Sequence, residues 1–157
     1  VAQFVRPCLE RGIRLDVLCG NHDVLYRETN SVNSLEHYLD RPGFTVHSRP
    51  TEIEYDGVTV CGVPWINREN FDESVSVMAN SRSSVCVGHF ELSGFAMYKG
   101  VVARGGHSAA PLSRFDRVLS GHYHTRSSQG NVTYMGSQME FTWADCEDDK
   151  YFHVLDT

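Results

Sequence analysis

The amino-acid sequence predicts an α/β domain with mixed sheets, and two observations lead to this class. Short apolar runs of strand length alternate with segments whose apolar residues recur at helical spacing. Two further stretches have the pattern of β-hairpins, which adds antiparallel strands to this alternation. The chain has 157 residues, which is enough for one domain with its own core, so we treat residues 1–157 as a single domain.

The first residues predict a helix followed by a buried strand. Residues 1–11 have a weakly helical pattern that Pro7 interrupts, and Gly12 is a typical residue to end such a helix. Residues 13–19 form an apolar run of strand length that ends at Gly20.

A second helix is predicted over residues 31–39, followed by a short strand over residues 44–47. Ser31 is suited to cap the N-terminus of this helix. One face of the helix carries four apolar or aromatic residues, which are Val32, Leu35, Tyr38 and Leu39.

The middle of the chain predicts a hairpin and a third helix. In the stretch TEIEYDGVTVCGVPW, apolar and polar residues alternate around Asp56-Gly57, a dipeptide typical of tight turns. Residues 70–80 predict a helix whose inward face carries Phe71, Val75 and Met78.

The second half predicts two short strands, a long loop, a hairpin and a terminal strand. The two strands cover residues 84–87 and 117–119, and a glycine-rich loop covers residues 92–111 between them. A hairpin is predicted about Gly130-Asn131, and the last residues, YFHVLDT, predict a terminal strand.

Composition and charge narrow the function classes. The net charge is −6 with histidine neutral, which excludes a nucleic-acid binder that relies on a basic surface. The five cysteines are far apart and form no CxxC pair, so we expect buried thiols in a reducing cytosol. No apolar run approaches the roughly 18 residues of a membrane span.

Residues that can bind metals follow the ends of three predicted strands. Each strand ends in or next to glycine, in the stretches VLCGNHD, CVGHFE and LSGHYH. Ligands of open α/β folds bind at the carboxyl ends of strands, so these tips are expected to form one pocket. The metal-ligand candidates are Asn21, His89, His122 and His124.

The residue types indicate a catalytic metal site. Imidazoles with an amide oxygen and no thiolate favour Mn, Fe or Zn. If the HYH segment is extended, His122 and His124 share a face. His22 is the candidate acid for a leaving alkoxide, and Asp23 is the candidate group that positions His22.

The other histidines and the tryptophans carry no such signal. We interpret His37, His47, His107 and His153 as structural or surface residues, although His107 stays open as a substrate contact. Trp65 and Trp143 favour core or loop packing over stacking on bases, and Glu91 fits a supporting or a surface role equally.

The motifs GNHD, GH and GHxH, in this order, resemble those of the calcineurin-like metallophosphoesterase superfamily. Within it, CVGHFELSGFAMYKG and the spacing to SGHYH resemble the nuclease subunits of T-even-type phage recombination endonucleases, counterparts of SbcD-like DNA repair nucleases. The resemblance runs from about Ile13 to the C-terminus.

This resemblance implies an αββα sandwich with two divalent metal ions, with Mn²⁺ expected and Zn²⁺, Fe²⁺ or Mg²⁺ as alternatives. It implies that Asn21, His89 and His122 bind one metal, His124 binds the other, and His22 is catalytic. It also implies hydrolysis of DNA by exonuclease and endonuclease action, by a homodimer that works with an SbcC-type coiled-coil ATPase. No membrane is involved, and a phage-encoded enzyme would act in the host cytoplasm.

The sequence departs from the family pattern at its start. The family begins with strands that end in Asp-x-His and Gly-Asp-x-x-Asp, and neither motif occurs here. We therefore expect residues 1–157 to be an N-terminally truncated domain without the bridging carboxylate. Such a chain should bind metal weakly and have little or no activity by itself.

Two other functions remain open, together with a plain α/β domain whose histidines occur by chance. One is a metallophosphoesterase that acts on nucleotides or phosphoproteins, which uses the same ligands. The other is a non-catalytic scaffold with the phosphoesterase fold.

Overall fold

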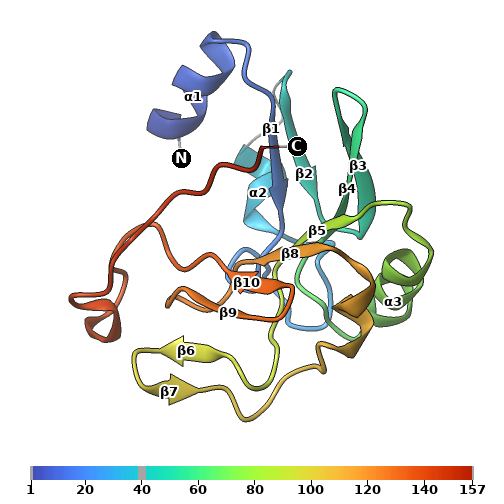
Figure 1. Ribbon diagram of the computed structural model, residues 1–157. Helices are drawn as coiled ribbons and strands as arrows, with labels where there is room; N and C mark the ends of the chain where they lie inside the picture. Colours follow the sequence, from blue (N-terminus) through green and yellow to red (C-terminus); the bar gives the residue numbers. More distant parts are fainter. Residues whose placement is uncertain (1, 39–41, 157) are drawn as a thin grey trace.

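The computed structural model describes residues 2–38 and 42–156, and it has the mixed α/β architecture that the sequence predicts (Figure 1). A six-stranded sheet forms the centre, a two-stranded parallel sheet lies beside it, and a short hairpin completes the strands. None of the helices among the described residues is long and apolar enough to cross a membrane.

The main sheet has the strand order β3-β4-β5-β8-β10-β9. Its four inner strands are parallel, and the two outer strands pair antiparallel to their neighbours. The strands are β3 (Thr51–Tyr55), β4 (Val58–Val63), β5 (Val85–Gly88), β8 (Arg117–Ser120), β9 (Ser127–Gln129) and β10 (Val132–Tyr134). The parallel strands therefore deliver their carboxyl ends to one edge of the sheet.

Both predicted hairpins are confirmed. The turn between β3 and β4 has φ of 49° at Asp56 and 88° at Gly57, so both central residues adopt the left-handed conformation of a type I′ turn. Gly130, with φ of 57°, turns the chain between β9 and β10.

The small sheet pairs β1 (Leu15–Leu18) with β2 (Phe44–His47) in parallel register, and both strands lie where the sequence predicts a strand. Helix α1 (Ala2–Glu10) precedes it and contributes Val5 to a small core with Phe44. Gly12 follows α1 with φ of 71°, which a glycine adopts without strain.

A polar cluster connects the two sheets. The Asp16 side chain on β1 is 2% exposed and accepts hydrogen bonds from His47 Nε2 at 2.7 Å and from the Tyr55 hydroxyl at 2.9 Å. Arg14 adds a salt bridge from Nε at 2.8 Å. We call Arg14, Asp16, His47 and Tyr55 the Asp16 cluster.

The second helix is shorter than predicted and has a different cap. Helix α2 covers Ser34–Tyr38, and Asn33 Oδ1 accepts from the backbone N–H groups of Leu35 and Glu36 at 3.0 Å. The prediction of Ser31 as N-cap is wrong, because it lies two residues before the actual cap, Asn33, and its hydroxyl accepts from the Thr29 hydroxyl instead. Val32 is 40% exposed rather than inward. The side chain of Tyr38 and all of Leu39 lie outside the described residues.

Helix α3 (Phe71–Asn80) has the predicted bounds but a different inner face. Met78 is buried together with Ser74, whereas Phe71 is 43% and Val75 37% exposed. Phe71 and Val75 line a shallow apolar cavity of about 170 Å³ beside the loop of His107, and this cavity opens to solvent.

The main core lies between the sheet, α3 and the long loop that follows β5. Its side chains include Cys61, Cys86, Phe90, Val118 and Tyr134. The loop contains the hairpin of β6 (Ala96–Tyr98) and β7 (Val101–Val102) and the short 3₁₀ helix η1 (Ala110–Arg114).

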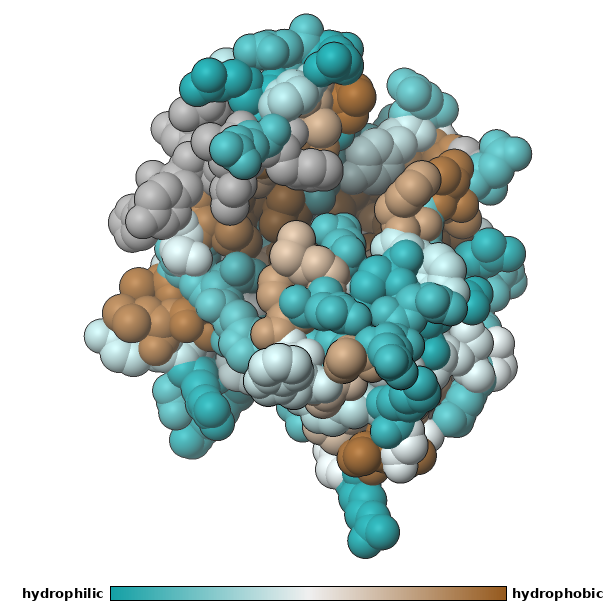
Figure 2. Space-filling view, turned by 90° about the vertical axis from the view of Figure 1, so that its left-hand side faces the viewer, coloured by the Kyte–Doolittle hydropathy of each residue, from teal (hydrophilic) through white to brown (hydrophobic). Residues whose placement is uncertain are grey.

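The opposite face of the main sheet borders an apolar cavity of about 380 Å³, lined by residues such as Leu18, Val60, Val87 and Leu119. Figure 2 shows apolar side chains in a hollow between polar groups on one side of the molecule.

The predicted terminal strand is wrong. Residues 151–156 form no strand, and Thr157 lies outside the described residues. His153 Nε2 bonds to the Met135 carbonyl at 2.9 Å, but Phe152 and Val154 are 85% and 84% exposed. A strand needs a ladder of backbone hydrogen bonds, and this segment forms none with the described residues.

Candidate metal centre

The ends of three strands from both sheets meet at one place. The Gly121 N–H donates to the Gly88 carbonyl at 2.9 Å, which aligns the ends of β8 and β5. The Trp65 N–H donates to the Cys19 carbonyl at 2.8 Å, which brings the end of β1 to the end of β4. The residues that follow these ends, Asn21, His89 and His122, therefore converge.

Three polar atoms form a close triangle. Asn21 Oδ1 lies 2.8 Å from His89 Nε2 and 3.2 Å from His122 Nδ1. The two ring nitrogens are 3.3 Å apart. We call these three atoms the donor triangle. The sequence predicts one pocket for Asn21, His89, His122 and His124, and this geometry brings the first three together, while His124 is not part of the donor triangle.

With the Asn21 oxygen toward both rings, hydrogen bonding cannot satisfy all three atoms of the donor triangle at once. The amide oxygen of Asn21 only accepts, so a ring nitrogen that bonds to it must carry a proton. If both rings carry that proton, two N–H groups oppose each other across 3.3 Å. If one ring lacks it, its lone pair faces the lone pairs of the oxygen. A cation between the atoms removes the conflict, because each atom can then offer a lone pair.

The spacing of the donor triangle also fits a metal ion. Nitrogen and oxygen ligands bound at roughly 2.1 Å lie about 3.0–3.4 Å from their neighbours around the ion. The observed separations of 2.8, 3.2 and 3.3 Å lie at or near this range. Asn21, His89 and His122 are therefore a suitable ligand set for one divalent ion.

Two glycines make room for the His89 ring. A Cβ on Gly20 would lie 2.9 Å from His89 Cε1, and one on Gly121 would lie 3.1 Å from Nδ1. The His89 ring passes directly over the backbone at both glycines. These contacts explain why each of the motifs GNHD and GHYH begins with glycine.

The environment keeps both rings of the donor triangle neutral. Burial, with smaller contributions from the nearby His122 and His22, lowers the pKa of His89 to about 3. Burial also lowers the pKa of His122, although Glu91 opposes this effect. A neutral imidazole is the form that binds a metal.

His122 has an unusual backbone conformation. Its φ of 87° lies in the left-handed region, which residues with a side chain rarely adopt and which stores strain. Because of this angle the HYH segment is not extended at His122, so the condition under which His122 and His124 were expected to share a face is not met. The Nδ1 atom of His122 faces Asn21, whereas Nδ1 of His124 faces Asp145 at 3.0 Å.

The segment after His89 is fixed from the core. Ser120 Oγ accepts from the Phe90 N–H at 3.1 Å. The Tyr134 hydroxyl donates to the Phe90 carbonyl at 2.9 Å and accepts from the Leu92 N–H at 3.0 Å. Side chains of β8 and β10 thus hold the chain on which the His89 ring stands.

His22 and Asp23 lie on the turn that carries Asn21. His22 is exposed, and its charge influences His89. Asp23 Oδ2 accepts from the Gly20 N–H at 2.7 Å, and the Asp23 N–H donates to the Gly20 carbonyl at 3.1 Å. Asp23 therefore closes the turn, and its predicted role in positioning His22 stays a prediction.

Two carboxylates near the histidines were not assigned from the sequence. Asp145 bonds to His124, and Glu91 Oε2 lies 3.9 Å from His122 Nε2. The pattern Thr142-x-x-Asp145 is a capping-box signature that could have identified Asp145 as a buried group. Nothing in the sequence joins it to His124.

The remaining histidines and Trp143 lie outside the donor triangle, in different environments. His47 belongs to the Asp16 cluster, His107 and His153 are exposed, and His37 lies outside the described side chains. Trp143 is 95% exposed, so the interpretation of this residue as a packing group is wrong. It stands on a short 3₁₀ helix, η2 (Trp143–Asp145), that turns its side chain outward.

Histidines and acids alone do not complete a metal site. Within residues 2–38 and 42–156, no group of three or more His, Cys, Asp or Glu side chains is arranged to hold a metal ion. The donor triangle consists of two imidazoles and one amide, so the neutral amide of Asn21 is its essential third member.

Comparison of the sequence with known proteins shows similarity to a phage nuclease subunit. No protein-family model matches the chain. The chain is 35% identical to exonuclease subunit 1 of Enterobacteria phage T4 over 158 aligned positions. The alignment covers 99% of this chain and 46% of that protein, so the chain spans about half the length of the relative. The similarity thus relates this chain to a phage nuclease subunit.

Proposed function

We propose that this chain carries part of the active site of a metallophosphoesterase that hydrolyses DNA phosphodiester bonds. The observation that supports it most is the donor triangle, which three distant segments form at the ends of β1, β5 and β8. The 35% identity to a phage exonuclease subunit favours DNA as the substrate. A partial calcineurin-like domain over residues 1–157 is part of the same proposal.

Asn21, His89 and His122 would hold one divalent ion, and His124 would contribute to a second. Mn²⁺ is the first choice for an N/O donor set, and Zn²⁺, Fe²⁺ and Mg²⁺ are the alternatives. When bound, such ions supply Lewis-acid stabilisation of the charge that develops on phosphoryl oxygens.

His22 would protonate the 3′ oxygen that leaves the phosphorus. Its exposed imidazole stands beside Asn21, at the edge where a phosphate would lie. Asp23 would position His22 through the backbone, since its carboxylate closes the turn at Gly20. A positioned general acid contributes about 10²–10⁴-fold to a rate.

The assembly proposed around this site follows from the relative. That protein is named a subunit, so we infer that this chain works in a complex that acts in phage recombination or repair. A homodimer with an SbcC-type coiled-coil ATPase in the host cytoplasm is the arrangement we propose. The net charge of −6 fits a nuclease whose hold on DNA depends on metals and a partner.

The decisive experiment measures cleavage of linear duplex DNA with Mn²⁺ by the full-length protein that contains this chain. His22→Ala should slow cleavage by about 10²–10⁴-fold and leave Mn²⁺ binding intact. His89→Gln should lose both DNA cleavage and Mn²⁺ binding. His153→Gln, an exposed histidine on the terminal segment, is the matched control.

Unchanged turnover of His22→Ala would refute its role as the acid. A parallel assay with a generic aryl phosphodiester separates a DNA nuclease from a phosphoesterase for nucleotides or phosphoproteins. Cleavage of the small ester with no cleavage of DNA would favour the latter.

One observation favours a non-catalytic scaffold as the second candidate. No three His, Cys, Asp or Glu side chains of the described residues form a metal site without the Asn21 amide. Titration of the full-length protein with Mn²⁺ and Zn²⁺ discriminates between the two functions. Absence of tight binding would favour the scaffold and contradict the nuclease.

A further inference from the structure

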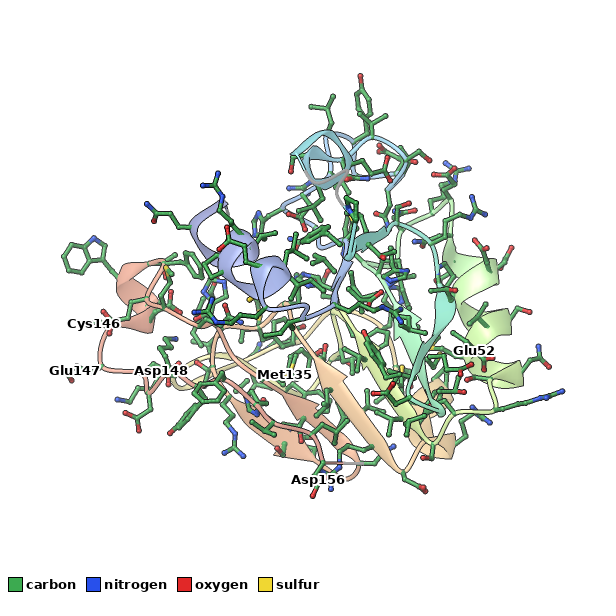
Figure 3. The ribbon with its side chains drawn as sticks, turned by 90° about the horizontal axis from the view of Figure 1, so that it is seen from above. Glu52, Met135, Cys146, Glu147, Asp148 and Asp156 are labelled. Carbon is green, nitrogen blue, oxygen red and sulfur yellow. The ribbon has the colours of Figure 1, made fainter. Side chains whose placement is uncertain are left out.

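Asp145 is the most thoroughly bonded buried acid outside the two clusters described above. It is 1% exposed and ends the short helix η2. The labelled residues that follow it, Cys146, Glu147 and Asp148, lie at one edge of the molecule, away from Glu52 of β3 (Figure 3). A buried carboxylate at such an edge needs partners that justify its burial.

The two oxygens of Asp145 share one partner and differ in the others. Oδ2 accepts from the N–H groups of Phe141 and Thr142 at 3.0 and 2.8 Å and from the Thr142 hydroxyl at 3.0 Å. Both oxygens face His124 Nδ1, Oδ1 at 3.0 Å and Oδ2 at 3.1 Å, and Oδ1 also lies 3.6 Å from Lys150 Nζ. The carboxylate therefore builds the turn through Oδ2 and faces the imidazole with both oxygens.

These partners also fix the charge of Asp145. Burial raises its pKa, but the N–H groups, the hydroxyl and His124 together hold that pKa well below its usual range. The group that faces His124 is therefore a carboxylate, which can only accept a hydrogen bond.

The His124 ring is held on several sides. Its Nδ1 edge meets Asp145, and the rings of Tyr98 and Phe141 lie 6.0 and 5.9 Å from its centre. No hydrogen bond from a described residue reaches Nε2, on the opposite edge of the ring. An Nδ1–H group bonded to a carboxylate leaves the lone pair on Nε2.

We propose that Asp145 is a positioning residue that holds His124 as the Nδ1–H tautomer, so that its Nε2 lone pair is available to a divalent cation. This inference rests on the proposed function for the identity of the cation, but the tautomer itself does not depend on it. Carboxylates that bond to the second nitrogen of a ligand histidine typically change metal affinity by about 10–100-fold.

The first measurement is the tautomer of His124 in the metal-free protein, from ¹⁵N-edited NMR spectra of the imidazoles at a pH where the rings are neutral. The His124 signals are assigned by their loss in His124→Gln. The wild type should show the Nδ1–H form. In Asp145→Asn the ratio of Nδ1–H to Nε2–H should fall by roughly tenfold or more, the equivalent of one charged hydrogen bond.

Two control variants separate positioning from folding. Thr142→Val removes the cap hydroxyl of η2 and keeps the carboxylate, so the tautomer ratio should stay as in the wild type. Asp148→Asn removes a neighbouring acid that bonds to Thr125 and Lys150 but not to His124, and it should also leave the ratio unchanged. An equal change of the ratio in Thr142→Val would overturn the proposal, because the turn alone would then orient the ring.

The second measurement follows the His124 signals during a Zn²⁺ titration. Half-saturation should need about 10–100-fold more Zn²⁺ in Asp145→Asn than in the wild type. If the wild-type signals do not respond to Zn²⁺, the proposed metal role of His124 fails. The tautomer ratio then still tests whether Asp145 positions the His124 ring. A wild-type His124 in the Nε2–H form overturns the inference directly, even if Asp145→Asn does not fold.

Discussion

The Asp16 cluster and the donor triangle both place imidazole beside an oxygen, yet only the first is complete. In the Asp16 cluster one carboxylate accepts from a histidine, an arginine and a tyrosine, so each donor has an acceptor. In the donor triangle two imidazoles share one neutral amide oxygen and oppose each other. The side chains of the donor triangle are half-buried, and a polar group that loses water without gaining a full set of partners is costly.

The Asp16 cluster and the donor triangle differ because only the first contains a carboxylate. Burial raises the pKa of Asp16, and the bonds from His47, Arg14 and Tyr55 outweigh it, so the net pKa is lowered. His89 has no such counterion, and burial lowers its pKa to about 3. The comparison teaches that the Asp16 cluster satisfies its own hydrogen bonds, whereas the donor triangle leaves two imidazoles competing for one oxygen.

Removal of the central acid should have the largest effect on stability. Asp16→Ala leaves three donors without their acceptor and should cost about 2–3 kcal/mol, the loss expected for charged hydrogen bonds. Urea denaturation measures this, with exposed Asp116→Ala as the control. A loss below 0.5 kcal/mol, roughly that of an ordinary surface substitution, would show that the Asp16 cluster does not stabilise the fold.

Crowding the donor triangle should have the next largest effect. Gly20→Ala adds a methyl group 2.9 Å from His89 Cε1 and should cost about 1–3 kcal/mol by overpacking. Gly105→Ala is a matched control, because no atom lies within 4 Å of its new Cβ. Thermal unfolding of both variants checks the prediction, and equal midpoints would contradict the tight approach of the ring.

Conversion of the donor triangle into a complete cluster should be stabilising. Asn21→Asp supplies a carboxylate that accepts from both imidazoles, and we expect the metal-free protein to gain about 1 kcal/mol. Chemical denaturation without metal is the measurement. A loss of stability would mean that the amide already satisfies both rings.

The smallest effect is a dependence on pH. The folded-state pKa of Asp16 lies below the usual pKa of an aspartate, so its stabilising contribution is present above that usual pKa. The contribution is lost as the pH falls through the folded pKa. The difference in free energy of unfolding between the wild type and Asp16→Asn should therefore narrow from pH 6 towards pH 3. A constant difference would contradict a lowered pKa of Asp16 in the folded state.

The sequence predicted the strand ends and the convergence of Asn21, His89 and His122 because both depend on local signals. Apolar runs, glycines and turn dipeptides report on a few neighbouring residues, and parallel strands then bring their ends together. The bounds of β2 and of the β3–β4 hairpin agree for the same reason.

The features that were missed depend on distant contacts or on one dihedral angle. The departure of the HYH segment from an extended conformation follows from the φ of 87° at His122, which no residue preference indicates. Asp145, the partner of His124, is 21 residues away along the chain. The terminal stretch YFHVLDT has the composition of a strand but finds no ladder partner among the described residues.

The hydrogen bonds from Tyr134 and Ser120 to the segment after His89 affect which size of ion the donor triangle could accept. Because the core holds this backbone, His89 cannot move away from Asn21 and His122 without disturbing buried hydrogen bonds. Calcium forms bonds of about 2.3–2.6 Å and prefers six to eight oxygens, so it would need a wider and more flexible frame. We therefore expect this centre to discriminate against calcium by rigidity rather than by charge.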